Sequence, residues 1–265
     1  MQGIQNKTKV LVQTVKVYLP CQQEFGYELL HVVPRINGDT DEKIIVHERD
    51  KNSLYPNATK RLIITPMNSS VKGVGVEKTT KEIWNSVKEY FGPGHKYIEP
   101  ALIRGERKWF VPQVRDLEFE IDVVVFPRKK KYMAAKNWSQ WHELVDALKA
   151  EGLKVFAGGC GFSSEHVNCP SAWDYANHLD ATIYAILHSK IRLGIITALH
   201  ILSVMCGRET WVLTNKKGMS HIRSNTPPNI SYIRTADHLN AGVKTIPLLE
   251  DVRGIVNAVA YRCSS

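Results

Sequence analysis

The second half of the chain alternates short apolar runs with amphipathic segments, and this alternation constrains the fold more than any other feature. Residues 121–126 and 191–196 are rich in β-branched and aliphatic side chains, which is typical of buried strands. Between them, residues 137–150 carry apolar side chains at helical spacing, and residues 154–157 form another apolar run. Strands that alternate with helices build right-handed βαβ units and a parallel sheet. Further helices are expected over residues 174–188, 199–205 and 248–261, and a further strand over 210–214.

The first half shows a shorter version of the same pattern. Three runs have the composition of strands: residues 10–19, 43–47 and 61–65. Residues 79–91 have helical spacing and end at a Gly-Pro-Gly stop, whereas residues 99–120 read as a connector. We predict a compact α/β chain with two Rossmann-like halves facing a cleft, and domains over residues 1–116 and 117–265.

Charge and cysteine content narrow the functional classes. The 265 residues include 35 Lys plus Arg and 26 Asp plus Glu, a formal charge of +9, which favours a polyanionic partner such as nucleic acid, anionic lipid or a phosphorylated ligand. The five cysteines have no C-x-x-C spacing, which argues against a disulfide framework or zinc ribbon. Because no apolar run reaches the roughly 18 residues of a membrane span, and no secretory signal is visible, we expect a cytoplasmic protein without a transmembrane segment. If its source is viral, that means the host cytoplasm.

A basic cluster follows the strand at residues 121–126. It contains Arg128, Lys129, Lys130 and Lys131, with Lys136 close behind and a helix after it. In a parallel sheet this loop lies at the carboxyl edge, where ligands bind, and a helix N-terminus adds N–H groups and partial positive charge. The position favours a phosphate-binding role over the alternative of a solvated charged loop.

Two other strand ends carry candidate ligand contacts. Gly158 and Gly159 follow the strand at residues 154–157, where a ligand can approach the backbone closely, although a plain tight turn is the favoured interpretation of the two glycines by themselves. Thr197 can cap the helix after residues 191–196, and its hydroxyl and the first N–H groups can hold phosphate oxygens. His200 lies in the first turn of that helix. Its spacing is compatible with a ligand contact and with a packing histidine.

Acidic residues near the first strand are candidates for proton transfer. Glu24 and Glu28 flank Gly26 in a Glu-Phe-Gly-Tyr-Glu segment, and either can serve as a general base or as an acidic residue at a helix N-terminus. Asp39 and Asp41 form a D-x-D pair of the kind that binds a divalent metal with a diphosphate. Because the pair follows an Asn-Gly turn signal, a solvated turn is the favoured interpretation.

Residues 121–215 resemble the ADP-heptose-type lipopolysaccharide heptosyltransferases. The shared features are a strand and proline loop with a Lys-x-Trp entry to a helix at Lys136, a strand ending in Gly158-Gly159, and an Asp-(Ser/Thr)-Gly-x-x-His element. The last element keeps Thr197 and His200 but has Ile196 for the aspartate and Ala198 for the glycine. The Glu-Phe-Gly-Tyr-Glu segment also resembles a Glu-Phe-Gly-Trp-Glu motif of some phage-encoded glycosyltransferases.

The resemblance implies a GT-B-like fold and an inverting, metal-independent glycosyltransferase. No cofactor is implied, because the nucleotide sugar is a substrate. The first domain would bind the acceptor and supply the base, Glu24 or Glu28, whereas the second would bind the nucleotide sugar. The residues implied to bind the donor are Arg128, Lys129, Lys136, Gly158, Gly159, Thr197 and His200.

The sequence is compatible with more than one class of acceptor. The positive charge suits DNA that carries hydroxymethylated pyrimidines, and it equally suits lipopolysaccharide or another glycan. The change to Ile196 raises a second hypothesis, a non-catalytic nucleic-acid-binding module with a degenerate transferase fold. A third hypothesis is a metal-dependent transferase that uses Asp39 and Asp41. The sequence does not indicate an oligomeric state.

Overall fold

The computed structural model divides the chain into two compact units that are not contiguous in sequence. The first unit contains Met1–Gln22, Thr40–Arg49 and Ala58–Ile103, and the second contains Gln23–Asp39, Asp50–Asn57 and Arg104–Ser265. The structure describes residues 14–21, 25–48, 51–64, 76–104, 107–109, 111–129, 137–161, 163–195, 197–214, 243–247 and 251–265.

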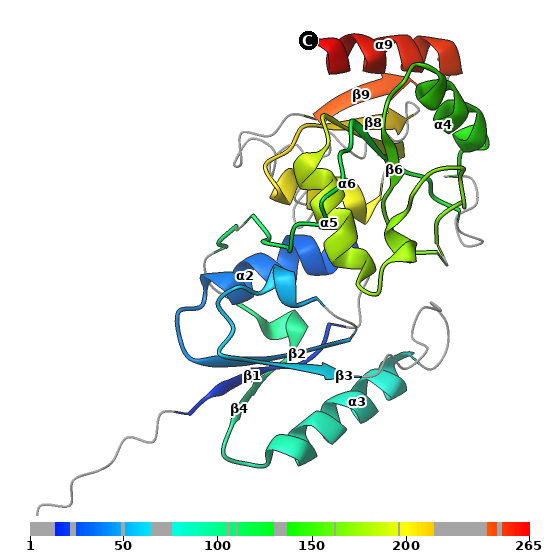
Figure 1. Cartoon of the computed structure of the whole chain (residues 1–265). Helices are drawn as coiled ribbons and strands as arrows, with labels where there is room; N and C mark the ends of the chain where they lie inside the picture. Colours follow the sequence, from blue (N-terminus) through cyan, green and yellow to red (C-terminus); the bar gives the residue numbers. More distant parts are fainter. Residues whose placement is uncertain are drawn as a thin grey trace, which may run out of the picture. The chain divides into compact units, whose positions relative to one another are not determined.

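The first unit is a parallel sheet of short strands with one long helix (Figure 1). Its strands are β1 (Lys16–Tyr18), β2 (Lys43–Glu48), β3 (Lys60–Ile64) and β4 (Lys96–Ile98), and its helix is α3 (Val76–Phe91). The spatial order is β3-β2-β1-β4, which is the order of a Rossmann half. Val17 and Leu19 of the first strand region pack with Val87 of α3, which covers one face of the sheet. A short 3-10 helix, η3 (Pro100–Leu102), follows β4.

The second unit holds a larger parallel sheet. Its strands are β5 (Val123–Phe126), β6 (Val155–Ala157), β7 (Ile191–Ile195), β8 (Thr210–Thr214) and β9 (Val243–Pro247). The spatial order is β6-β5-β7-β8-β9. Counted within the unit this is 2-1-3-4-5, a common doubly wound order that requires helices on both faces. The buried, apolar sequence Val-Val-Val-Phe of β5 is what a central strand covered on both faces needs.

Helices cover both faces of this sheet (Figure 1). The helices α4 (Trp141–Ala150) and α9 (Val252–Ser264) pack with Val123 and Val125 in one buried cluster. Side chains alternate along a strand, so Phe126 points to the other face, where its ring meets His200 of α6 (Ala198–Met205) edge-on at 5.4 Å. The helix α5 (His178–His188) contributes Thr182 to the same face.

A helical segment from the first half of the chain belongs to the second unit. It consists of α1 (Phe25–Tyr27), a π-helical turn η1 (Glu28–Val32) and α2 (Val33–Gly38), and it is joined by the 3-10 helix η2 (Asn52–Leu54). Pro34 has no N–H to donate, and its ring would clash with the carbonyl four residues earlier in a regular α-helix. The wider π-helical turn just before Pro34 relieves that clash.

The predicted α/β fold class with two Rossmann-like halves is confirmed. The strands predicted at residues 43–47, 61–65, 121–126 and 210–214 and the helix at 79–91 correspond to observed elements with ends shifted by a few residues. The expected helix at 174–188 begins at His178, because Ala172–Asp174 forms a separate 3-10 helix, η5, and Asn177 caps α5. β4 and β9 were not predicted. The predicted cut after Asp116 assigns residues 23–39 and 50–57 to the first domain, whereas their contacts lie in the second unit.

Candidate active site

Most of the predicted site residues lie at the carboxyl edge of the second unit's sheet. β5 pairs with β6 on one side and with β7 on the other, and the chain leaves β5 toward α4 on one face but leaves β7 toward α6 on the opposite face. In an open α/β sheet, the divergence of such neighbouring loops creates the crevice in which ligands bind. The switch point of this unit therefore lies between the ends of β5 and β7.

The loop after β5 is held by a second loop. Arg128 forms an isolated antiparallel bridge with Ser164, and the Lys129 N–H donates to the Ser163 carbonyl over 2.9 Å. Arg128 is only 8% exposed, whereas Lys129 is exposed and its Nζ lies 3.2 Å from Glu165 Oε1. The structure therefore fixes the backbone of both predicted residues at the sheet edge. Lys136 lies outside the described residues.

The loop after β6 requires both of its glycines. A Cβ on Gly158 would lie 2.9 Å from the Phe126 ring, and a Cβ on Gly159 would lie 2.7 Å from Ser164 Oγ. Gly159 also has φ of +122°, a conformation that side-chain-bearing residues rarely adopt. Its N–H donates to Thr182 Oγ1 over 3.0 Å, so this amide is occupied within the protein. The turn is thus closely packed against the protein interior beside the switch point.

Thr197 and His200 form a capping box at the start of α6. Thr197 Oγ1 accepts from the Leu199 N–H over 3.2 Å, and His200 Nδ1 accepts from the Thr197 N–H over 3.3 Å. Thr197 is half-buried, whereas His200 is 0% exposed. Burial lowers the pKa of His200 to about 4, and backbone hydrogen bonds oppose that shift only in part. The ring is therefore neutral at physiological pH, and it orders the turn on which Thr197 sits.

The Glu-Phe-Gly-Tyr-Glu segment lies against this same turn. A Cβ on Gly26 would lie 3.7 Å from the Ala198 Cβ and 3.3 Å from Ile201 Cδ1, so α1 packs closely on the start of α6 at this glycine. Two motifs separated by about 170 residues in the chain are thus adjacent within one unit. Glu24, the first residue of the segment, lies outside the described residues.

Glu28 is buried, and both of its carboxylate oxygens have partners within the protein. Its carboxylate is 2% exposed, with Oε2 at 2.5 Å from Lys51 Nζ and Oε1 accepting from the Tyr55 hydroxyl over 2.9 Å. Lys51 Nζ also lies 5.6 Å from the centre of the Phe25 ring. This arrangement anchors the helical segment to residues 51–55 and leaves no carboxylate oxygen of Glu28 directed to solvent. Nothing in the sequence signals these partners, because they lie more than twenty residues from Glu28.

Acidic clusters do not form a metal centre in the part of the chain that the structure describes. No group of three or more His, Cys, Asp or Glu side chains there is arranged to hold a metal ion. Asp41 of the D-x-D pair forms an ion pair with Lys16 at 2.5 Å. Nor is any helix among the described residues long and apolar enough to cross a membrane.

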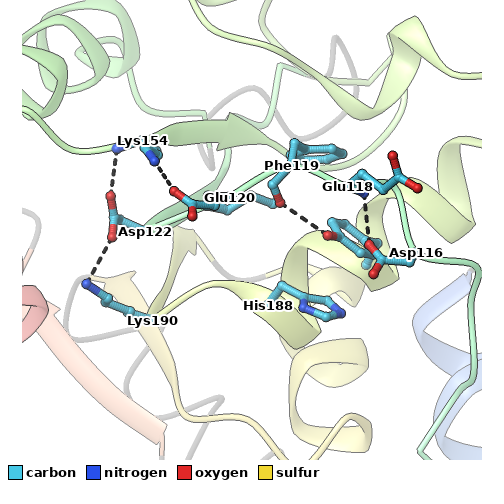
Figure 2. A pocket seen from close by; sticks show the side chains of 10 residues that line it. Asp116, Glu118, Phe119, Glu120, Asp122, Lys154, His188 and Lys190 are labelled. Atoms are coloured by element: carbon cyan, nitrogen blue, oxygen red, sulfur yellow. Dashed lines mark hydrogen bonds and ion pairs between the residues drawn. The ribbon is translucent and has the colours of Figure 1, made fainter.

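A pocket of about 490 Å³ lies at the opposite, amino edge of the second sheet. Figure 2 shows that it is lined by Glu120 and Asp122, which precede β5, by Lys154, which precedes β6, and by Lys190, which precedes β7. Lys154 pairs with Glu120, and Lys190 pairs with Asp122 at 3.1 Å. These opposite charges satisfy one another, and none of the predicted site residues lines the pocket. The candidate site therefore stays at the carboxyl edge.

The chain contains two Rossmann-type parallel sheets, and the second sheet has a switch point of the kind at which ligands bind. Together these features define a GT-B-like α/β fold. Among solved structures, the E. coli ADP-heptose lps heptosyltransferase II is similar, with 13% identity, a TM-score of 0.56, and coverage of 96% of this chain and 100% of that chain. A glycosyl transferase family 9 protein from Veillonella parvula has 8% identity, a TM-score of 0.55, and coverage of 94% and 97%. At these identities the likeness establishes the fold, and it confirms the structural side of the predicted heptosyltransferase resemblance. No family model matches the sequence, and no curated protein matches it.

Proposed function

We propose that the chain is a glycosyltransferase that moves a sugar from a nucleotide-sugar donor to an acceptor hydroxyl. The observation that carries the proposal is the contact of Gly26 with Ala198, which unites the candidate base segment with the helix start at the switch point. The fold shared with a heptosyltransferase and a glycosyl transferase family 9 protein supports the same class.

In this proposal the diphosphate lies at the switch point. Arg128 and Lys129 supply positive charge from the loop after β5, with Lys136 further along the same connection. The Thr197 hydroxyl supplies a hydrogen bond, and the N-terminus of α6 supplies the positive end of a helix dipole. Gly158 and Gly159 form the close-packed turn beside this position, and neutral His200 holds the capping turn in place.

The chemical step is a single displacement with inversion. The acceptor oxygen attacks the anomeric carbon, the bond from that carbon to the phosphate oxygen breaks, and its electron pair leaves on the nucleoside diphosphate. A carboxylate accepts the acceptor proton. We assign that role to Glu24, because both oxygens of Glu28 are engaged by Lys51 and Tyr55. Protein cations and the α6 N-terminus stabilise the departing diphosphate, so the proposed step needs no metal.

Donor binding and turnover test the proposal. Thermal unfolding should shift upward with at least one of a panel of ADP- and UDP-sugars. Release of nucleoside diphosphate should be abolished by Glu24→Gln and should persist in excess chelator. A protein that shows neither a thermal shift nor nucleoside diphosphate release with any donor would contradict the proposal. Loss of release in chelator would instead indicate a metal-dependent transferase.

The acceptor in the proposal is a glycan or a hydroxymethylated pyrimidine in DNA. Mass spectrometry of nucleosides from hydroxymethylated DNA, after incubation with the donor panel, would detect a DNA acceptor directly. The same donors with lipopolysaccharide core oligosaccharides test the glycan. Cytoplasmic location stays a prediction.

A further inference from the structure

The helical segment that follows Glu24 is attached to other parts of the second unit at two places. Near its start, Gly26 packs on α6, where a Cβ built on the glycine would lie 3.7 Å from the Ala198 Cβ. Further along, the Pro34 carbonyl accepts from the backbone N–H of Lys108 over 2.8 Å. The segment, α6 and Lys108 all belong to the second unit. The turn that contains Gly26 is therefore held within the same compact unit as the switch point.

One lysine contacts both ends of this turn. The Lys51 ammonium lies 2.5 Å from Glu28 Oε2 and 5.6 Å from the centre of the Phe25 ring, within the range of a cation–π contact. Phe25 and Glu28 directly flank Gly26 and Tyr27 in the sequence. Only 16% of the Lys51 side chain is exposed, so water and salt screen its charge weakly. Lys51 therefore restrains the turn from both sides of the glycine that contacts α6.

The loop that carries Lys51 is itself bound to the helical segment. The Asn37 side-chain amide donates to the Leu54 carbonyl over 3.0 Å in a buried contact, and the Asn57 side-chain amide donates to the Asn37 carbonyl over 3.0 Å. These bonds fix the loop at residues 51–57 against the end of α2. The Lys51 backbone is therefore held in place, and its side chain reaches the turn from a fixed position.

We propose that Lys51 is a positioning residue that keeps the turn after Glu24 on α6, so that the base and the diphosphate site belong to one body. This inference rests on the proposed glycosyltransferase function with Glu24 as the base. Glu24 directly precedes Phe25, so a restraint on Phe25 also restrains the backbone of the base. Lys51 acts through Phe25 and Glu28, and it takes no part in the chemical step.

This arrangement changes what a movement between the two units can do during turnover. The family resemblance implied a base in the first domain, so that the distance from base to donor would depend on how the two domains approach each other. Residues 23–39 and 50–57 instead belong to the second unit, together with the switch point. The distance from base to donor is then independent of a shift between the units. Such a shift would move only groups of the first unit.

Steady-state kinetics of Lys51 variants test the positioning role. Lys51→Met removes the charge, whereas Lys51→Arg keeps a cation for Glu28 and the Phe25 ring. Lys190→Met is the matched control, because it also deprives a carboxylate of its lysine, Asp122 at 3.1 Å, but at the amino edge of the sheet. Nucleoside diphosphate release gives kcat, and calorimetric titration with the same ADP- or UDP-sugar gives the donor Kd. Both are measured at a temperature at which every variant is folded.

We expect Lys51→Met to lower kcat about tenfold to a hundredfold, because displacement of a reacting group by about 1 Å has an effect of this size. The donor Kd should stay at the wild-type value, because Lys51 acts on the base and not on the diphosphate site. Lys51→Arg should recover most of the kcat, and Lys190→Met should keep all of it. An unchanged kcat in folded Lys51→Met, or an equal loss in Lys190→Met, would overturn the inference.

A disulfide across the contact with α6 tests the fixed position without a change at Lys51. The separation of 3.7 Å between the Gly26 and Ala198 Cβ positions lies within the range of disulfides, about 3.5–4.5 Å. We expect the double variant Gly26→Cys, Ala198→Cys to form this disulfide on oxidation, as identified by mass spectrometry of peptides. Its turnover should be the same in the oxidised and the reduced state.

The single variant Gly26→Cys, oxidised in the same way, controls for oxidation of the native cysteines. Failure of the disulfide to form would show that the turn is not held on α6, and it would overturn the inference. The same holds for a loss of turnover on oxidation that a reductant restores, because the turn would then have to leave α6 during the reaction. Failure of the glycosyltransferase proposal is recognised separately, as absence of nucleoside diphosphate release by the wild type from every donor. Disulfide formation does not depend on turnover, so it reports on the fixed position in either case.

Discussion

Replacement of Glu28 by glutamine separates an anchoring role from a catalytic one. Glutamine keeps the shape of the side chain and an oxygen that can accept from the Tyr55 hydroxyl, but it removes the charge opposite Lys51. The carboxylate is 2% exposed and the Lys51 side chain is 16% exposed, so the ammonium would lose its counterion in a largely buried place. We therefore expect Glu28→Gln to destabilise the protein.

The magnitude follows from the burial of the pair. Loss of one partner from a fully buried ion pair costs about 3–5 kcal/mol. The residual exposure of Lys51 allows its ammonium to recover part of its hydration, so we expect about 2–3 kcal/mol. Lys51→Met should cost a similar amount. The double variant should be less destabilised than the sum of the single changes, by about 1–3 kcal/mol of coupling.

Urea unfolding, with nucleoside diphosphate release measured in parallel, provides the assay. A lower unfolding midpoint with an unchanged slope reports a loss of stability. Glu24→Gln is the comparison, with turnover expected to fall at least about a hundredfold and the midpoint expected to stay the same. If Glu28→Gln instead unfolds at the wild-type midpoint and has no turnover, Glu28 is the base and the anchoring role is refuted.

Three other features yield expected outcomes. Gly159→Ala should lower the free energy of unfolding by about 2–4 kcal/mol, because φ is +122° and the new Cβ would lie 2.7 Å from Ser164 Oγ. Gly207→Ala is the control, because φ is +66° there and the space around its Cβ is open. It should cost about 1–2 kcal/mol in the same urea experiment. The pKa of His200 in the folded protein is about 4, below its ordinary value of 6.5. The stability that the neutral ring contributes is therefore complete above pH 6.5 and is lost as the pH falls toward 4, by up to about 3 kcal/mol. Unfolding midpoints measured against pH would contradict this if the midpoint of His200→Gln fell with pH as steeply as that of the wild type. Burial raises the pKa of Cys206 to about 12, so iodoacetamide at pH 8 should leave this thiol unmodified in the folded protein, and mass spectrometry of the peptides would reveal any labelling.

The sequence predicted the parts of the fold that depend on local periodicity. The strand at β5 is a continuous apolar run, and α4 has apolar side chains at helical spacing, so both were recognisable from single segments. β9 was missed because Val243–Pro247 contains a lysine, a threonine and a proline, and its strand character comes from pairing with β8 at the edge of the sheet. Tertiary pairing of this kind has no local signal.

The site was predictable in its location but not in its internal contacts. Strand ends marked the loops of Arg128, Gly158 and Thr197, because the carboxyl ends of parallel strands meet at one edge. The contact between Gly26 and α6 and the ion pair of Glu28 depend on residues far apart in the chain. Neither can be inferred from spacing, since no single segment contains both partners.

The discontinuous units also bear on how such a protein can be recombined. The chain passes between units after residues 22, 39, 49, 57 and 103, so no single crossover exchanges one Rossmann-like half for that of another protein with this fold. A chimera joined at the centre of the chain would leave α6 without the α1 segment that packs on it. Under the proposed function, donor specificity should therefore diversify by substitution within loops. Engineering by domain exchange would need residues 23–39 to be transferred together with the C-terminal half.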